Sequence, residues 1–257
     1  MTTAQSVEAT ATPRYGRVFF WFNAVVACLA VGVSFTLAVT GYYVDTMDLA
    51  TPTILGNVPG GNDTVLERLL DWSTFFTILS NIVVLIVTTM LVARPDLFTR
   101  PDRTGTVWRT LRLDSVLMII ITGVVYNLLL ATGGKTGWDL ISNTLLHVVV
   151  PILTPIVWII AGPRGLISPR IIGYSLALPL LWAAYALVRG AAVGAYPYPF
   201  LDVATNGLAS VLVFITAIVV IAVLLALVLW AVDAGLRWTL RGSQVPAADP
   251  VAEPTAD

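Results

Sequence analysis

Six long apolar runs dominate the pattern of hydrophobic and polar positions along the chain. They cover residues 18–43, 72–93, 115–131, 140–161, 171–188 and 207–232. An apolar helix of roughly 20 residues is long enough to cross a hydrocarbon core of about 30 Å. The pattern therefore predicts an all-α protein, an integral membrane bundle of six transmembrane helices. The third run is the shortest, because Asp114 and Gly133 bracket it.

The composition agrees with a membrane location. Hydrophobic residues make up 57% of the chain and charged residues 11%, and the mean hydropathy is +0.87. We assign residues 14–241 to the six-helix transmembrane domain, and we expect the polar segments 1–13 and 242–257 to be disordered tails. Membrane lipids are the expected partners, with no nucleic-acid partner. The sequence leaves the oligomeric state open.

The basic residues indicate how the bundle is oriented. Eleven of the 14 lysine and arginine residues fall in alternate connections, and the remaining three are Arg68, Lys135 and Arg189. Because cytoplasmic connections carry the excess of positive charge, we expect both termini to be cytoplasmic and residues 44–71 to face outward. Arginine outnumbers lysine thirteen to one, as in a high-GC bacterial genome. The expected location is a bacterial inner membrane.

His147 is the only histidine, and it lies inside the fourth apolar run. Ionisable side chains at membrane depth are costly and commonly mark functional sites. At about 1.5 Å per residue, His147 lies about 10 Å inside the outer end of its run. By the same measure Thr77, Asn81 and Asn127 lie about 7, 13 and 6 Å inside theirs. The four polar side chains are therefore expected in one layer of the outer leaflet.

Helical periodicity places polar side chains on shared faces, because residues three, four and seven apart lie on one side of a helix. The two polar faces carry Thr74, Thr77 and Asn81 in the second run and Asn143, His147, Pro151 and Pro155 in the fourth. Prolines remove backbone hydrogen bonds and favour a bend beside a cavity. We expect the second and fourth helices to be neighbours, with Thr77 and His147 within hydrogen-bond range across a polar chamber.

A hydroxyl, an imidazole and several amides at one depth are the components of covalent acyl transfer. Thr77 is the candidate nucleophile and His147 the candidate base. The side chains that can donate to an oxyanion or line the chamber are those of Asn81, Asn127, Asn143 and Ser80. Lys135 and Arg189, near outer helix ends, are candidates to hold a substrate carboxylate, and interfacial anchoring is their other interpretation.

Three short segments, in order along the chain, resemble motifs of the androgen-induced protein family. They are residues 72–81 (WSTFFTILSN), 145–151 (LLHVVVP) and 196–202 (YPYPFLD). The resemblance implies a multipass membrane threonine hydrolase of fatty acid esters of hydroxy fatty acids, with Thr77 and His147 at the matching catalytic positions. Asp202 stands where the animal members commonly have glutamate. We therefore expect a bacterial six-helix relative that hydrolyses lipid esters in the outer leaflet.

The segment 196–202 combines two prolines and three aromatic residues with one acid. This composition suits a rigid turn at the headgroup interface. We expect this outer loop, with Tyr198 and Asp202, to fold over the mouth of the chamber and to hold Asp202 near the polar layer.

Two other classes of function stay open at this point. His147 can be the titrating group of a small-solute or proton carrier, and the protein can be a non-catalytic membrane scaffold whose Thr and Asn side chains serve helix packing. One histidine and one cysteine do not supply a bis-histidine haem or a thiolate metal site. No metal or other cofactor is expected.

Overall fold

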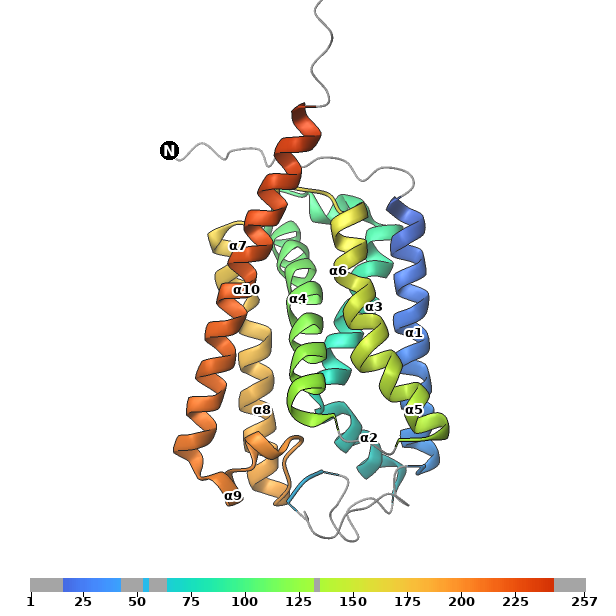
Figure 1. Cartoon of the computed structure of the whole chain (residues 1–257), viewed down its shortest axis with the longest axis vertical. Helices are drawn as coiled ribbons and strands as arrows, with labels where there is room; N and C mark the ends of the chain where they lie inside the picture. Colours follow the sequence, from blue (N-terminus) through green and yellow to red (C-terminus); the bar gives the residue numbers. More distant parts are fainter. Residues whose placement is uncertain (1–15, 43–52, 56–63, 132–134, 243–257) are drawn as a thin grey trace, which may run out of the picture.

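The computed structural model describes residues 16–42, 53–55, 64–131 and 135–242, and these residues form a bundle of helices (Figure 1). Within the described residues there is no β-strand, only an isolated bridge between Ile54 and Tyr196. Six membrane-length helices run along the bundle: α1 (Gly16–Thr40), α3 (Phe76–Ala93), α4 (Arg103–Val125) with a π-helical turn (Tyr126–Leu130), α5 (Gly137–Thr144) continued by a π-helical turn (Leu145–Val149) into α6 (Val150–Ala161), α7 (Pro169–Ser175) followed by α8 (Ala177–Val193), and α10 (Leu208–Gly242). The protein is a multipass, all-α membrane protein.

Shorter elements connect these helices. They are α2 (Val65–Thr74), the 3-10 turns Pro95–Phe98 and Pro199–Leu201, and α9 (Val203–Asn206). A capping box begins α2: Thr64 accepts from the backbone N–H of Glu67, and the Glu67 carboxylate accepts from the N–H of Thr64. The predicted tails, 1–13 and 242–257, lie outside the described residues apart from Gly242, where α10 ends.

Several predicted spans have different boundaries in the structure, and the sixth, predicted to end at residue 232, continues as α10 to Gly242. The third run was predicted to begin at residue 115, but α4 begins at Arg103, capped by the Asp102 carboxylate, which accepts from the Gly105 N–H. Hydropathy does not locate this end of the helix, because the first turns of α4 contain arginines where the helix leaves the membrane. Asp114, which bounded the predicted run, is 1% exposed inside the helix.

The second predicted span is not one helix. The backbone at Phe75 is extended, with φ −71° and ψ 131°, so α2 ends at Thr74 and α3 begins at Phe76. The Trp182 indole N–H donates to the Thr74 carbonyl at 2.8 Å and so satisfies a carbonyl at the end of α2. The periodicity predicted that Thr74 shares a helical face with Thr77 and Asn81. This prediction is wrong, because Thr74 belongs to α2 and the other two residues belong to α3.

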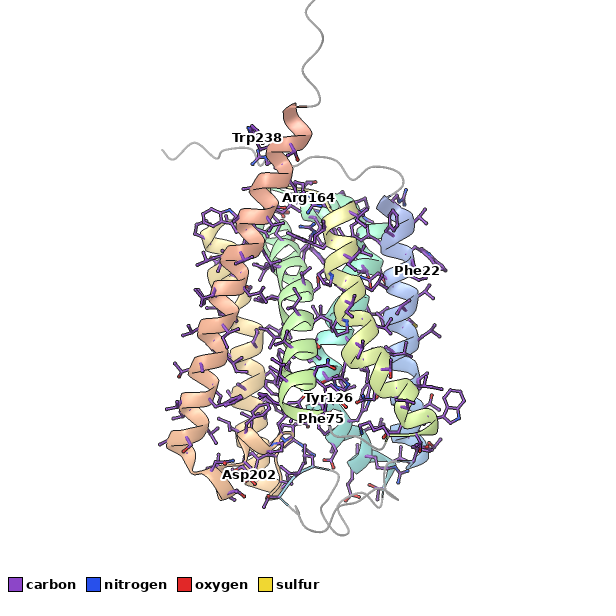
Figure 2. All side chains as sticks on the ribbon, in the orientation of Figure 1. Phe22, Phe75, Tyr126, Arg164, Asp202 and Trp238 are labelled. Carbon is purple, nitrogen blue, oxygen red and sulfur yellow. The ribbon has the colours of Figure 1, made fainter. Side chains whose placement is uncertain are left out.

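The centre of the bundle is built by α1, α3, α4 and α6, which pack directly on one another. α4 and α6 approach closely at Gly123, where an added Cβ would lie 2.7 Å from the Pro151 Cβ. α8 and α10 lie at the periphery beside α4, and most of their large apolar side chains point outward (Figures 1 and 2). Such outward apolar side chains suit a lipid environment.

Charged side chains are buried at one end of the bundle. Arg164 and Asp233 are each 2% exposed and approach to 3.9 Å, and the Gly165 N–H donates to Asp233 at 2.7 Å. The guanidinium groups of Arg112 and Arg164 lie over the Trp158 ring. α1 begins and α10 ends at this same end (Figure 1), which agrees with an even number of spans. Following the arginine distribution, we call it the inner end and the opposite one, with Asp202, the outer end (Figure 2).

Candidate active site

Thr77 and His147 meet between α3 and the π-helical turn at Leu145–Val149. The Thr77 Oγ1 atom lies 3.1 Å from the His147 Nε2 atom. The predicted hydrogen-bond contact between these two side chains is therefore confirmed. The break at Phe75 explains the position of Thr77, because it places this residue in the first turn of α3 rather than in the middle of a helix.

The second ring nitrogen of His147 defines the tautomer. His147 Nδ1 lies 3.1 Å from the Asn143 carbonyl oxygen, which can only accept, so Nδ1 carries the hydrogen. In the neutral imidazole Nε2 is then an acceptor, directed at the Thr77 hydroxyl. The His147 ring is also stacked on Tyr126, with centroids 3.7 Å apart and an interplanar angle of 19°. Hydrogen bonding and stacking together hold the ring in one orientation.

The amide side chains of Asn81 and Asn127 have a different role from the predicted oxyanion donation. Pro151 has no N–H, so carbonyls in the preceding turn lack a helical donor. Asn127 Nδ2 donates to the His147 carbonyl at 3.0 Å, and Asn81 Nδ2 donates to the Thr77 carbonyl at 2.8 Å and to the Leu146 carbonyl at 3.3 Å. Both amides therefore support the bent helix and are directed at backbone carbonyls rather than at the Thr77 hydroxyl.

The other two predicted chamber residues also face the backbone or a neighbouring hydroxyl. Ser80 donates to the Thr77 carbonyl at 3.0 Å and lies 2.8 Å from the Thr122 hydroxyl. Asn143 reaches the site through its main-chain carbonyl, which accepts from His147. The polar layer expected from depth is present, but its members mostly bond to each other and to the main chain.

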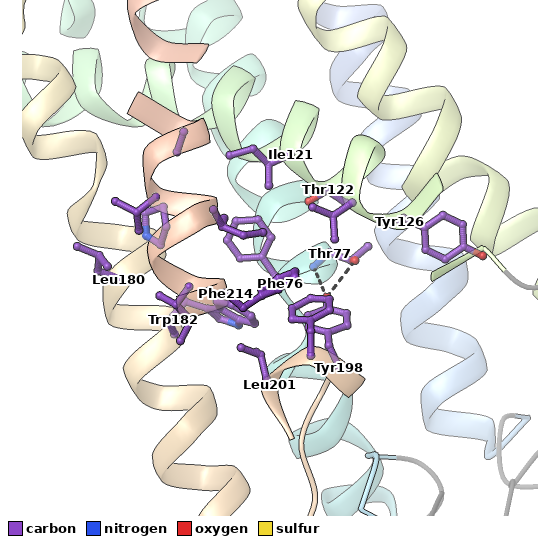
Figure 3. A pocket seen from close by; sticks show the side chains of 18 of the residues that line it. Phe76, Thr77, Ile121, Thr122, Tyr126, Leu180, Trp182, Tyr198, Leu201 and Phe214 are labelled. Atoms are coloured by element: carbon purple, nitrogen blue, oxygen red, sulfur yellow. Dashed lines mark hydrogen bonds between the residues drawn. The ribbon is translucent and has the colours of Figure 1, made fainter. Parts of the chain in front are cut away.

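Tyr198, from the outer loop, contacts the nucleophile candidate directly. Its hydroxyl accepts the Thr77 backbone N–H at 3.2 Å and lies 3.3 Å from Thr77 Oγ1 (Figure 3). Burial raises the pKa of Tyr198, although hydrogen bonds from the first turn of α3 act in the opposite direction. Tyr198 therefore stays a protonated donor. The sequence placed this residue over the chamber but did not assign it a contact, because the helix break at Phe75 was not foreseen.

Asp202 holds the outer loop in place. Its carboxylate caps α9 by accepting the N–H groups of Ala204 and Thr205, and it accepts from the Thr53 hydroxyl at 2.6 Å. Burial opposes ionisation, but these hydrogen bonds prevail and lower the pKa of Asp202. Asp202 is buried rather than in free solvent, as predicted, but these hydrogen-bond partners belong to a loop and to α9 rather than to the polar layer.

A cavity of about 90 Å³ opens beside Thr77 (Figure 3). Its polar edge carries Thr77, Thr122, Tyr126 and Tyr198, and the rest of its wall comes from apolar side chains of α3, α4, α8, α10 and the outer loop. The predicted polar chamber is thus an apolar cavity with a polar edge. The reason is that the amide groups expected to line it turn towards backbone carbonyls.

The two cations near the outer helix ends have acidic partners. Lys135 Nζ lies 3.2 Å from the Asp139 carboxylate, one helical turn away. Arg189 Nη2 lies 2.5 Å from the Asp71 carboxylate, whose pKa is raised by burial against the opposing effect of Arg189. Within the described residues, neither cation forms a hydrogen bond with Thr77 or His147. Both cations are paired with carboxylates, and their role in holding a substrate carboxylate stays a prediction.

Among the described residues, no group of three or more His, Cys, Asp and Glu side chains is arranged to hold a metal ion. Comparison of the chain with protein-family profiles, with curated proteins and with solved structures gave no match in any of the three. The geometry defines the class as a six-helix membrane protein with a threonine–histidine pair at the outer end of the bundle.

Proposed function

We propose that this protein is an integral membrane hydrolase of lipid esters, in which Thr77 is the nucleophile and His147 the general base. The observation that carries this proposal is the Thr77–His147 contact of 3.1 Å, with His147 Nδ1 bonded to the Asn143 carbonyl. A nucleophile bonded to a base, with the base oriented by a third group, is the recurring arrangement of covalent acyl transfer. The motif resemblance to the androgen-induced protein family supports the same two residues.

The reaction runs in two stages. Thr77 Oγ1 attacks the ester carbonyl carbon while its proton passes to His147 Nε2, and the carbon–oxygen bond to the alcohol then breaks as His147 returns the proton to the leaving oxygen. Water next attacks the acyl-threonine, giving one proton to His147. Collapse of this second intermediate releases the carboxylic acid and restores the Thr77 hydroxyl with the proton from His147.

Donors for the oxyanion are available at the first turn of α3. In acyl transfer the backbone N–H of the nucleophile is a common oxyanion donor, and the positive end of the helix dipole favours negative charge. The Thr77 N–H now donates to the Tyr198 hydroxyl. An oxyanion at this position would receive the Thr77 N–H and, from a rotated hydroxyl, the Tyr198 O–H. These two groups replace the asparagine side chains in the proposed mechanism.

The location proposed for the reaction is the outer leaflet of a bacterial inner membrane. The arginine distribution supports this orientation, because it places the Thr77 end of the bundle away from the cytoplasm. An apolar cavity next to the nucleophile suits a lipid ester better than a polar substrate.

The carrier alternative has less support from the described residues. A carrier with His147 as its titrating group needs a polar route to and from the ring. Here one ring nitrogen bonds to a carbonyl, the other bonds to Thr77, and the neighbouring cavity is largely apolar. This arrangement activates a hydroxyl more readily than it moves a solute.

Labelling with an alkyl fluorophosphonate tests the hydrolase directly, because it requires an activated hydroxyl. Purified wild type is expected to be labelled and to hydrolyse lipid esters, whereas Thr77→Ala and His147→Ala each lose both activities. Thr77→Ser keeps the hydroxyl and is expected to keep labelling.

Thr88→Ala is the matched control. Thr88 is also a buried threonine of α3, but its hydroxyl bonds to the Val84 carbonyl of its own helix. This variant is expected to retain labelling and hydrolysis. Normal ester hydrolysis by folded Thr77→Ala would refute the proposal.

A further inference from the structure

The cavity beside Thr77 is elongated along the bundle. At its outer end it reaches Tyr198, Leu130 and Phe214, and at its inner end it reaches Leu176 and Ala222. The lining residues of α4, α8 and α10 give this direction consistently. α4 and α8 run from the inner to the outer end of the bundle, whereas α10 runs from the outer to the inner end. The polar side chains of its wall are Thr77, Thr122, Tyr126 and Tyr198, and none of them comes from α8 or α10.

The lining residues give the length of the cavity. On α10 they extend from Phe214 to Ala222, and eight residues at about 1.5 Å each correspond to about 12 Å. Carbon–carbon bonds of about 1.5 Å advance a zigzag chain by roughly 1.3 Å per carbon. The cavity therefore matches an unbranched chain of on the order of ten carbons.

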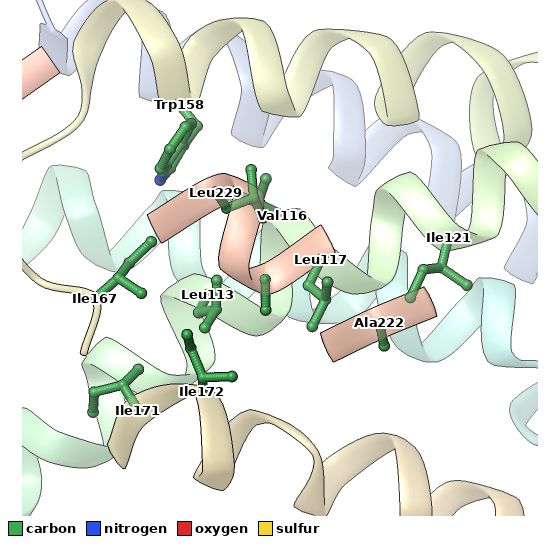
Figure 4. Packing of buried hydrophobic residues seen from close by; sticks show 11 residues of the cluster. Leu113, Val116, Leu117, Ile121, Trp158, Ile167, Ile171, Ile172, Ala222 and Leu229 are labelled. Atoms are coloured by element: carbon green, nitrogen blue, oxygen red, sulfur yellow. The ribbon is translucent and has the colours of Figure 1, made fainter. Parts of the chain in front are cut away.

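The inner end is closed by tightly packed side chains. Ala222 and Ile121 belong both to the cavity wall and to a buried cluster with Leu117 and Ile172 (Figure 4). Protein interiors of this kind are packed to the density of organic crystals, so a chain that continues inward past Ala222 must displace these side chains. Along the wall, the ring of Trp182 is fixed by its hydrogen bond to the Thr74 carbonyl.

We propose that this cavity binds the unbranched acyl chain of the ester and limits it to about ten carbons, with Ala222 as the residue that sets the limit. The inference rests on the proposed function, because the ester carbonyl is placed at Thr77 and the chain then points towards the membrane centre. Medium-chain acyl esters are thus the substrate class, and chains longer than the cavity are excluded or bind with their ends displaced.

Hydrolysis of p-nitrophenyl esters with acyl chains of four to sixteen carbons tests this limit. We expect kcat/KM for wild type to peak near ten carbons and to fall at least tenfold at sixteen. Ala222→Leu fills the inner end and is expected to move the peak to shorter chains by two carbons or more. Leu176→Ala removes a side chain from the same end and is expected to move the peak to longer chains.

Ala217→Leu is the matched control. Ala217 lies on the same helix but is exposed on the lipid side and does not line the cavity, so this substitution is expected to leave the peak unchanged. If the esters are hydrolysed but Ala222→Leu and Leu176→Ala have the wild-type chain-length profile, the acyl-chain inference is overturned while the hydrolase proposal stands.

A binding measurement separates the two proposals in the opposite case, in which no variant hydrolyses esters. Thermal unfolding is followed in a sterol-based detergent, whose rigid ring system does not enter an alkyl-sized cavity. Decanoate is expected to raise the melting temperature more than palmitate, and Ala222→Leu is expected to abolish this preference. Such a result supports the chain-binding cavity without catalysis, whereas equal effects of both fatty acids overturn it.

Discussion

Backbone groups without a helical partner determine what the polar side chains near Thr77 do. The carbonyls of Leu146 and His147 accept from the Asn81 and Asn127 amides, so both amides are directed away from the Thr77 hydroxyl. At the first turn of α3 the same rule has the opposite result, since the free Thr77 N–H attracts the Tyr198 hydroxyl into the site. The helix interruptions therefore decide which groups the Asn81, Asn127 and Tyr198 side chains contact.

Tyr198→Phe tests the oxyanion role at this scale. Losing one oxyanion donor costs about 100- to 1,000-fold in kcat, and we expect a loss of this size with KM little changed. Tyr185→Phe is the control, because the Tyr185 hydroxyl lies 3.4 Å from the Thr74 hydroxyl oxygen and, within the described residues, forms no hydrogen bond with Thr77. A Tyr198→Phe enzyme with wild-type kcat would assign Tyr198 to loop packing only.

At the scale of elements, two irregular helices create the site. The extended residue Phe75 begins a new helix just before Thr77, and the π-helical turn ahead of Pro151 carries His147. Interruptions of this kind are frequent at functional sites, because they expose backbone groups and redirect side chains. The second irregular segment packs on α4 at Gly123, where an added Cβ would lie 2.7 Å from the Pro151 Cβ and 3.5 Å from the His147 carbonyl oxygen.

Gly123→Ala tests that contact. The new Cβ would lie 2.7 Å from the Pro151 Cβ, so α4 and the His147 segment must separate. We expect a loss of about 1 to 3 kcal/mol in unfolding free energy and a larger relative loss of ester hydrolysis. Gly173→Ala is the control, because an added Cβ there meets no atom within 4 Å, and Ala favours helix. Equal stability of both variants would show that α4 and α6 tolerate separation.

For the whole molecule, the two ends of the bundle differ in chemistry. The inner end buries arginine with Asp233, whereas the outer end is closed by a loop that Asp202 and Thr53 hold together. The polar site with Thr77 and His147 lies towards the outer end. A core of packed, mostly aliphatic side chains lies between this site and the inner end. In the hydrolase that we propose, the orientation in the membrane therefore decides which leaflet supplies the substrate.

Reporter fusions test the orientation. Alkaline phosphatase fused after Gly242 is expected to be inactive, because the arginine distribution places the end of α10 in the cytoplasm. The same reporter fused after Asn206, in the connection between α9 and α10, is expected to be active and serves as the control. An active fusion after Gly242 would reverse the bundle and place Thr77 near the cytoplasmic leaflet.

The sequence alone predicted the six spans, the shared depth of Thr77 and His147, and their contact. Length, hydropathy and depth are one-dimensional properties, which follow from the order of residues and a constant helical rise. The boundary errors at α4 and at Phe75 occurred where this assumption fails. Charged residues continued one helix beyond its apolar run, and a single extended residue interrupted the other.

Only the tertiary structure decided which polar groups face the Thr77 hydroxyl. Asn81 and Tyr198 lie 117 residues apart in sequence, and the direction of each side chain depends on which neighbouring carbonyl or N–H lacks a partner. The cavity has the same origin, because its wall comes from α3, α4, α8, α10 and the outer loop. No local pattern encodes such a meeting of distant segments, since it depends on how whole helices pack.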